Sequence, residues 1–74
     1  MKVRVRLIGQ FSERLGFAEK DLEFPSAPTA AELTARVGLK GLEHVITREG
    51  LPLACEDRLK DKDRVVIAPI FSGG

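Results

Sequence analysis

The chain has 74 residues with twelve basic and eleven acidic side chains, and its formal net charge is +1. This length suits one small domain over residues 1–74 and excludes two, because a domain rarely has fewer than about 50 residues. The near balance of charge leaves no field that attracts a polyanion, so we expect no nucleic-acid partner.

A single cysteine, Cys55, and a single histidine, His44, limit the chemistry of the chain. They exclude an internal disulfide and a metal site built on two histidines or two cysteines, and we expect no metal. No apolar run approaches the ~20 residues of a membrane-spanning helix, and the N-terminus alternates instead of forming a signal-peptide core. A small fold without disulfides is expected in the cytoplasm, with no membrane partner.

Period-two alternation at the start of the chain predicts a strand over residues 2–7. Its apolar residues would share the buried face: Val3, Val5 and Leu7. Its cations would share the other face, which we interpret as solvated: Lys2, Arg4 and Arg6. In residues 10–16 the spacing of apolar residues changes, because Phe11 and Leu15 are one helical turn apart. This segment therefore predicts a short helix that ends at Gly16.

Residues 20–24 alternate again and predict a second strand, antiparallel to the first, with two inward side chains: Leu22 and Phe24. A helix is expected to begin at Thr29, because Thr29 and Glu32 have the spacing of a capping box, in which each side chain binds an exposed backbone N–H. Gly38 suits the left-handed stop of that helix. Two apolar residues one turn apart would face the sheet: Leu33 and Val37.

Further extended segments are expected in the second half of the chain. An apolar run at 45–46 leads to a turn at 49–50, and residues 51–53 are expected at a sheet edge, because their proline has no N–H for a ladder. A polar turn at 61–63 precedes residues 64–68, the most continuous β-branched run, which we predict as the central strand, buried on both faces and beside the first strand. This order of elements gives an α+β fold, a mixed sheet that curls over one main helix.

Residues 70–74 are expected to form a flexible tail with which the chain ends. Glycines have no side chain to pack and are costly to order, so their benefit is expected in a partner's site. A backbone without β-carbons can enter a narrow slot, with Ile70 and Phe71 as apolar anchors and Ser72 and Gly73 threading the terminus. A frayed end is the alternative, which two glycines alone would favour.

The group presented at the tip of this tail would be the carboxylate of Gly74. A carboxylate is a poor electrophile, so its use requires activation, for example as an acyl adenylate made from ATP. Attack by sulfur or by an amine could follow. The position of the glycines directly after a strand, on a domain with this order of elements, favours a function over a frayed end.

Four segments of the sequence resemble the MoaD/ThiS family of sulfur carriers, the bacterial relatives of ubiquitin with the β-grasp fold. They are residues 3–7, 11–16, 29–33 and 59–74, and the last is the most specific. The resemblance covers nearly the whole chain and implies a ubiquitin-like β-grasp roll. Residues 11–16 favour the MoaD branch, the molybdopterin synthase small subunit, because ThiS-like carriers usually have little between their first two strands.

The resemblance implies that an ATP-dependent adenylating enzyme, related to ubiquitin-activating enzymes, activates Gly74 and that a sulfur donor supplies a thiocarboxylate. In the MoaD branch the sulfur passes to a molybdopterin precursor in the synthase large subunit, and in the ThiS branch to the thiazole of thiamin through thiazole synthase. The chain would be a carrier and not an enzyme. It would bind no cofactor itself, because the ATP is bound and used by the activating enzyme. A protein modifier joined to lysines through Gly74, another sulfur acceptor, and a plain interaction module are the alternatives.

Cys55 and His44 are left out of the predicted site. Cys55 stands beside Glu56 and Asp57, whose charges disfavour a thiolate, and no histidine is near it in the sequence. His44 has no evident partner and is expected at the surface.

Overall fold

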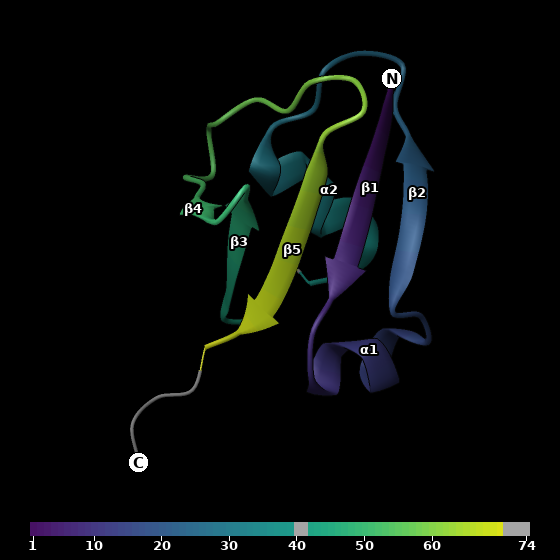
Figure 1. Cartoon of the computed structure of the whole chain (residues 1–74), viewed down its shortest axis with the longest axis vertical. Coiled ribbons are helices and arrows are strands. Elements are labelled where there is room, and N and C mark those ends of the chain that lie inside the picture. Colours follow the sequence, from purple (N-terminus) through teal and green to yellow (C-terminus); the bar gives the residue numbers. More distant parts are fainter. Residues whose placement is uncertain (40–41, 71–74) are drawn as a thin grey trace.

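The structure is a computed structural model that describes residues 1–39 and 42–70 (Figure 1). The elements are β1 Lys2–Leu7, α1 Gln10–Leu15, β2 Glu19–Glu23, α2 Ala30–Val37, β3 His44–Arg48, β4 Leu51–Pro52 and β5 Arg64–Pro69. The strands form one sheet in the order β2-β1-β5-β3-β4, and α2 lies across one face of it (Figure 1). Neither of these helices has the length and apolarity that crossing a bilayer needs.

The central position of β5 confirms the prediction made from its β-branched sequence. β5 pairs in parallel with β1 and antiparallel with β3. Val65 and Ile67 point into the core and are buried, with 1% and 0% of their surface exposed. The predicted burial of β5 on both faces is wrong, because α2 covers only one face of the sheet, and Val66 and Ala68 on the other face are partly exposed.

The first hairpin follows its predicted pattern on β1 and departs from it on β2. The apolar side chains of β1 are all buried: Val3, Val5 and Leu7. Between the two strands, α1 buries Phe11 and ends at Gly16, which has φ 82 and donates its N–H to the Ser12 carbonyl at 3.1 Å. Leu22 on β2 is only partly buried, because β2 has a neighbour on one side alone, and Phe24 lies just beyond the strand.

The predicted main helix is α2, and its capping residues act as expected with one difference. The Thr29 hydroxyl oxygen accepts a hydrogen bond from the backbone N–H of Glu32 at 3.2 Å. The Glu32 carboxylate accepts from the Thr29 hydroxyl at 3.2 Å instead of from a backbone N–H. Gly38 adopts φ 103 and ends the helix as predicted. Leu33 is fully buried against the sheet, whereas Val37 is partly exposed.

The core between α2 and the sheet is aliphatic except for one phenylalanine. Its buried members are Val3, Val5, Leu7, Phe11, Ala30, Leu33, Leu39, Ile46, Leu59, Val65 and Ile67. The connection from β4 to β5 is tied to the sheet by Asp63, whose Oδ2 accepts from Arg48 Nη1 at 2.9 Å and from the Lys60 N–H at 2.7 Å. Pro52 lies in the edge strand β4, as predicted.

Candidate functional site

The predicted site is the segment from Ile70 to Gly74, of which the structure describes the first residue. Phe71, Ser72, Gly73 and Gly74 lie outside the described residues. Ile70 follows β5 directly, and 51% of its surface is exposed. Its side chain is therefore not part of the core and is accessible to a partner, while its role as an anchor stays a prediction.

Pro69 defines the point at which the chain leaves the sheet. It is buried and pairs with His44 across the ladder between β5 and β3. Gly9 approaches it from the β1 side, and a β-carbon at Gly9 would lie 3.9 Å from Pro69 Cγ. Gly9 has φ 65 and ψ -138, a conformation that residues other than glycine rarely adopt. Neighbours on both sides thus fix the end of β5 immediately before Ile70.

Exposed apolar side chains surround this exit point on the sheet face that α2 leaves uncovered. Val45 is 38% exposed and pairs with Ala68 of β5. Ile8 is 45% exposed, and its N–H donates to the Ile67 carbonyl at 3.1 Å, which aligns Ile8 beside Ala68 from the β1 side. We call these residues the tail-proximal face: Ile8, Val45, Ala68 and Ile70.

The sequence-based prediction included Ile70 and missed the other members of this face. A signal for Ile8 was present, because it continues the alternation of Lys2, Arg4 and Arg6 and places an apolar side chain where that pattern predicts an exposed one. Val45 carried no such signal, since it stands beside Ile46 in an apolar run and only Ile46 is buried.

The outer face of β1 carries the predicted cations, and one of them is ion-paired across the first hairpin. Arg4 Nε donates to Asp21 Oδ1 at 2.9 Å, and Arg4 Nη1 lies 3.4 Å from Glu19 Oε1. The hydrogen bond from Arg4 lowers the pKa of the Asp21 carboxyl. A backbone N–H donated by Lys2 likewise lowers the pKa of Asp61. The predicted solvated face is therefore partly a network of exposed charges.

An apolar hollow between α2 and β3 brings His44 and Cys55 together. Its lining residues are Ala30, Ala31, Thr34, His44, Val45, Ile46, Leu53 and Cys55. His44 and Cys55 are distant in the sequence, but both line this hollow. The expectation that His44 lacks a partner is wrong, since its Nδ1–H donates to the Leu42 carbonyl at 2.7 Å. No cluster of three metal-ligating side chains occurs in residues 1–39 and 42–70.

The overall geometry defines a ubiquitin-like β-grasp protein: a mixed sheet that wraps one main helix, with its central strand running into the last residues of the sequence. No protein-family profile and no curated protein sequence matches the chain. Solved structures do match it.

The chain is similar to SAMP1 from Haloferax volcanii, with a TM-score of 0.82, 19% identity and coverage of 100% of both chains. A putative molybdopterin converting factor subunit 1 from Pyrococcus furiosus gives a TM-score of 0.84 at 21% identity, covering 93% of this chain and 97% of that one. The complex of subunits 1 and 2 of the molybdopterin-converting factor from Helicobacter pylori matches with a TM-score of 0.66 at 23% identity, over 100% of both chains. These likenesses confirm the β-grasp fold and the expected structural resemblance to MoaD-type proteins.

Proposed function

We propose that this protein is a ubiquitin-like sulfur carrier that carries sulfur on the carboxylate of Gly74. The observation that supports this most directly is the position of β5. The central, best-anchored strand of a β-grasp sheet leads within one residue of its end to the exposed Ile70 and then to the sequence Phe71-Ser72-Gly73-Gly74. A rigid base followed by glycines suits delivery of a carboxylate into another protein's active site.

The proposed reaction takes place on an activating enzyme. The Gly74 carboxylate attacks the α-phosphorus of ATP and displaces pyrophosphate, which gives an acyl adenylate. A sulfur donor then supplies hydrosulfide, which attacks the acyl carbon and displaces AMP, so a C–S bond replaces the C–O bond to the nucleotide. The product is a thiocarboxylate, and after it passes its sulfur to an acceptor, water restores the carboxylate. The carrier contributes no catalytic group besides its own terminus and binds no cofactor.

We place the acceptor in molybdopterin biosynthesis, in the cytoplasm, with the molybdopterin synthase large subunit as the partner. The fold supports this assignment, because a similar structure is one subunit of the Helicobacter pylori complex. The helix α1 between β1 and β2 supports it as well, since it occupies the segment that favoured the MoaD branch in the sequence. A thiazole synthase or a different acceptor is the alternative within the same chemistry.

Intact-protein mass spectrometry tests the carrier function. After incubation with the cognate activating enzyme, ATP and a sulfur donor, the protein should gain the mass difference between sulfur and oxygen. Deletion of Gly73 and Gly74 should abolish the gain and leave the fold intact. Cys55→Ser should retain the gain, because the proposed sulfur is bound to Gly74. A persulfide on Cys55 would instead add the mass of a whole sulfur atom without loss of oxygen, and this variant would lack it. The proposal would be contradicted if the mass stayed unchanged while the same enzyme preparation activated a known carrier protein.

The likeness to a small archaeal modifier protein favours a second function, conjugation of Gly74 to lysines of other proteins. The same acyl adenylate can react with an amine, so both functions share the first step. Immunoblots of cell extracts under denaturing conditions distinguish them. A ladder above the free mass that disappears on deletion of Gly74 supports conjugation, and a single band at the free mass contradicts it.

A further inference from the structure

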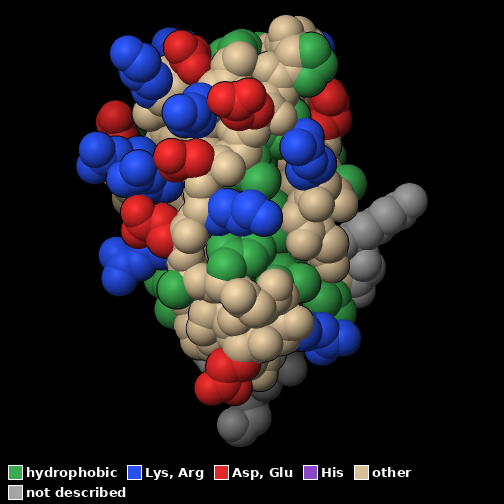
Figure 2. Space-filling view, turned by 90° about the vertical axis from the view of Figure 1, so that its right-hand side faces the viewer, with side chains coloured by type: hydrophobic (Ala, Val, Ile, Leu, Met, Phe, Trp, Pro, Cys, Tyr) green, Lys and Arg blue, Asp and Glu red, His purple; other side chains and the backbone are tan. Residues whose placement is uncertain are grey.

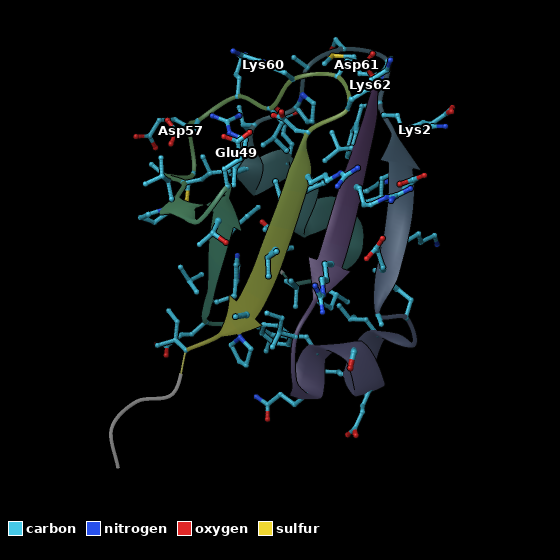
Figure 3. All side chains as sticks on the ribbon, viewed as in Figure 1. Lys2, Glu49, Asp57, Lys60, Asp61 and Lys62 are labelled. Carbon is cyan, nitrogen blue, oxygen red and sulfur yellow. The ribbon has the colours of Figure 1, made fainter. Side chains whose placement is uncertain are left out.

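A group of cations lies at the end of the sheet opposite the tail. Lys2 and Arg4 come from the beginning of β1, Lys62 from the turn before β5, and Arg64 from the first position of β5. Figure 3 shows Lys2 and Lys62 near the end of the sheet that lies away from the exit of the tail. From the sequence, only the cations of β1 could be predicted to lie together, because Lys62 and Arg64 are distant from them along the chain. We call these four residues the basic cluster.

The strand register concentrates this charge. Arg4 is the direct partner of Arg64 in the parallel pairing of β1 with β5. Like charges at directly opposed positions destabilise a sheet. The turn adds Lys62, whose N–H donates to the Lys2 carbonyl at 2.6 Å and whose φ is 70, a left-handed conformation that favours glycine over lysine. The chain thus has cations in places where the fold alone favours other residues.

Among the residues that the structure describes, the carboxylates near the cluster form ion pairs with only one of its four cations. Asp21 and Glu19 both bind Arg4. The Asp61 carboxylate accepts the backbone N–H of Lys2, and Glu23 is the strand partner of Lys2. Within residues 1–39 and 42–70, side-chain ion pairs involve Arg4 and Arg48 among the cations. Lys2, Lys62 and Arg64 are exposed and form no ion pair within this described part of the chain.

These side chains surround a hollow on the outer face of the sheet. Its volume is about 210 Å³, and its lining consists of Lys2, Arg4, Asp21, Lys62 and Arg64. Figure 2 views the sheet from the β2 side, and basic side chains alternate with acidic ones along the left of the molecule, where the outer face lies. The hollow is large enough for a carboxylate side chain to approach three unpaired cations.

We propose that the basic cluster is a docking site for acidic side chains of a protein partner. Carboxylates fit it better than nucleic acid, because the chain has a net charge of only +1 and so lacks the extended positive field that binds a polyanion. The cluster lies on the same outer face as the tail-proximal face, so one partner surface can cover both. Exposed charges of this kind accelerate association and set orientation, and salt screens their effect.

The position of the cluster defines where the partner's acidic residues lie. Arg64 and Ile70 are six residue steps apart along β5 and its extension, which corresponds to about 20 Å at ~3.3 Å per step. A partner that takes the tail into its active site should therefore present Asp or Glu side chains about 20 Å from the entrance. The identity of this partner as the activating or acceptor enzyme rests on the proposed function, whereas the affinity of the cluster for carboxylates does not.

An NMR titration with a hexaglutamate peptide tests the site without any sulfur chemistry. At low ionic strength, the largest amide shift changes of the ¹⁵N-labelled protein should occur at Lys2, Lys62 and Arg64, and 1 M NaCl should abolish them, since the Debye length is then only about 3 Å. The double variant Lys62→Asn/Arg64→Gln should lose the response, with asparagine chosen because it tolerates a positive φ.

A matched variant, Arg14→Gln/Lys20→Gln, removes the same charge elsewhere. Arg14 lies on α1, and the Lys20 ammonium lies over the Phe17 ring at 5.5 Å. This variant should respond like the parent protein. Equal loss of binding in both double variants, or shift changes spread over the whole surface, would overturn the proposal. Tighter binding of inorganic triphosphate than of hexaglutamate at the same residues would also overturn it, because it would indicate a site for small phosphates.

The initial rate of activation provides a second readout in the presence of the enzyme. Lys62→Asn/Arg64→Gln should lower kcat/KM roughly fivefold at low salt with little change in kcat, since exposed charges act mainly on association. The difference from the parent protein should shrink as salt increases. A uniform loss at every salt concentration would contradict electrostatic docking. Absence of thiocarboxylate in the parent protein would contradict the proposed function and leave the peptide titration unaffected.

Discussion

Two adjacent residues of β5, Val66 and Ile67, should differ sharply in what they contribute to stability. Ile67 is fully buried and faces Leu7 on one side and Ile46 on the other. Ile67→Ala removes three carbons from a packed core and should lower the free energy of unfolding by about 3–4 kcal/mol, the sum of lost transfer energy and an unfilled cavity. Val66→Ala lies on the outer face, where the side chain is partly exposed, and should cost about 1 kcal/mol or less.

The size of the first effect is large for a domain of this length. A protein of 74 residues has a stability of about 4–11 kcal/mol at ~0.05–0.15 kcal/mol per residue, so Ile67→Ala removes about a quarter of it or more. Urea unfolding followed by far-UV circular dichroism measures both variants, and the midpoint should move while the m-value stays constant.

A comparable loss in Val66→Ala and Ile67→Ala would refute the assignment of one covered and one uncovered sheet face. It would indicate that a second layer, such as another copy of the chain, covers the outer face. A concentration series of the midpoint distinguishes that case, because association makes the apparent stability depend on protein concentration.

Other substitutions test the tail, the helix cap and the surface charges. Ile70→Asp should reduce kcat/KM for activation by roughly tenfold or more while the unfolding midpoint stays within error, because Ile70 is exposed and a charge cannot enter an apolar partner pocket. Thr29→Ala should cost about 1 kcal/mol in urea unfolding through loss of the Glu32 N–H acceptor, and Thr29→Ser should restore most of it. Asp21 and Asp61 have lowered pKa values in the folded state, so their contribution to stability is present above their unfolded pKa of about 4 and is lost as pH falls through the folded values. Asp21→Asn should therefore flatten the acid limb of a stability–pH curve, and an unchanged limb would show that the Arg4 contact is not maintained in solution.

The elements of the fold could be predicted from the sequence because each has a local physical signal. Alternation identified β1, a capping box identified the start of α2, and Gly16 and Gly38 both adopt the left-handed stops that were expected. The β-branched run identified β5 as central. Its degree of burial was overestimated, since a continuous apolar run does not reveal whether one or two layers cover the sheet.

The candidate site was less predictable, because its parts meet only through long-range pairing. Ile8 and Val45 join Ile70 across β5, and Arg64 joins Arg4 through a parallel register that no local pattern encodes. His44 and Cys55 face one hollow for the same reason. No local pattern in the sequence places these residues side by side, so only Ile70 could be predicted as part of the site.

The position of β5 between β1 and β3 also determines when a chain becomes competent to act. The two halves of the sheet cannot join before residues 64–69 have been synthesised, because the first strand and the third strand meet only through the fifth. Residues 70–74 follow those residues directly along the chain. A product whose synthesis stops before residue 70 therefore offers no tail to an activating enzyme, and under the proposed function no ATP is spent on it.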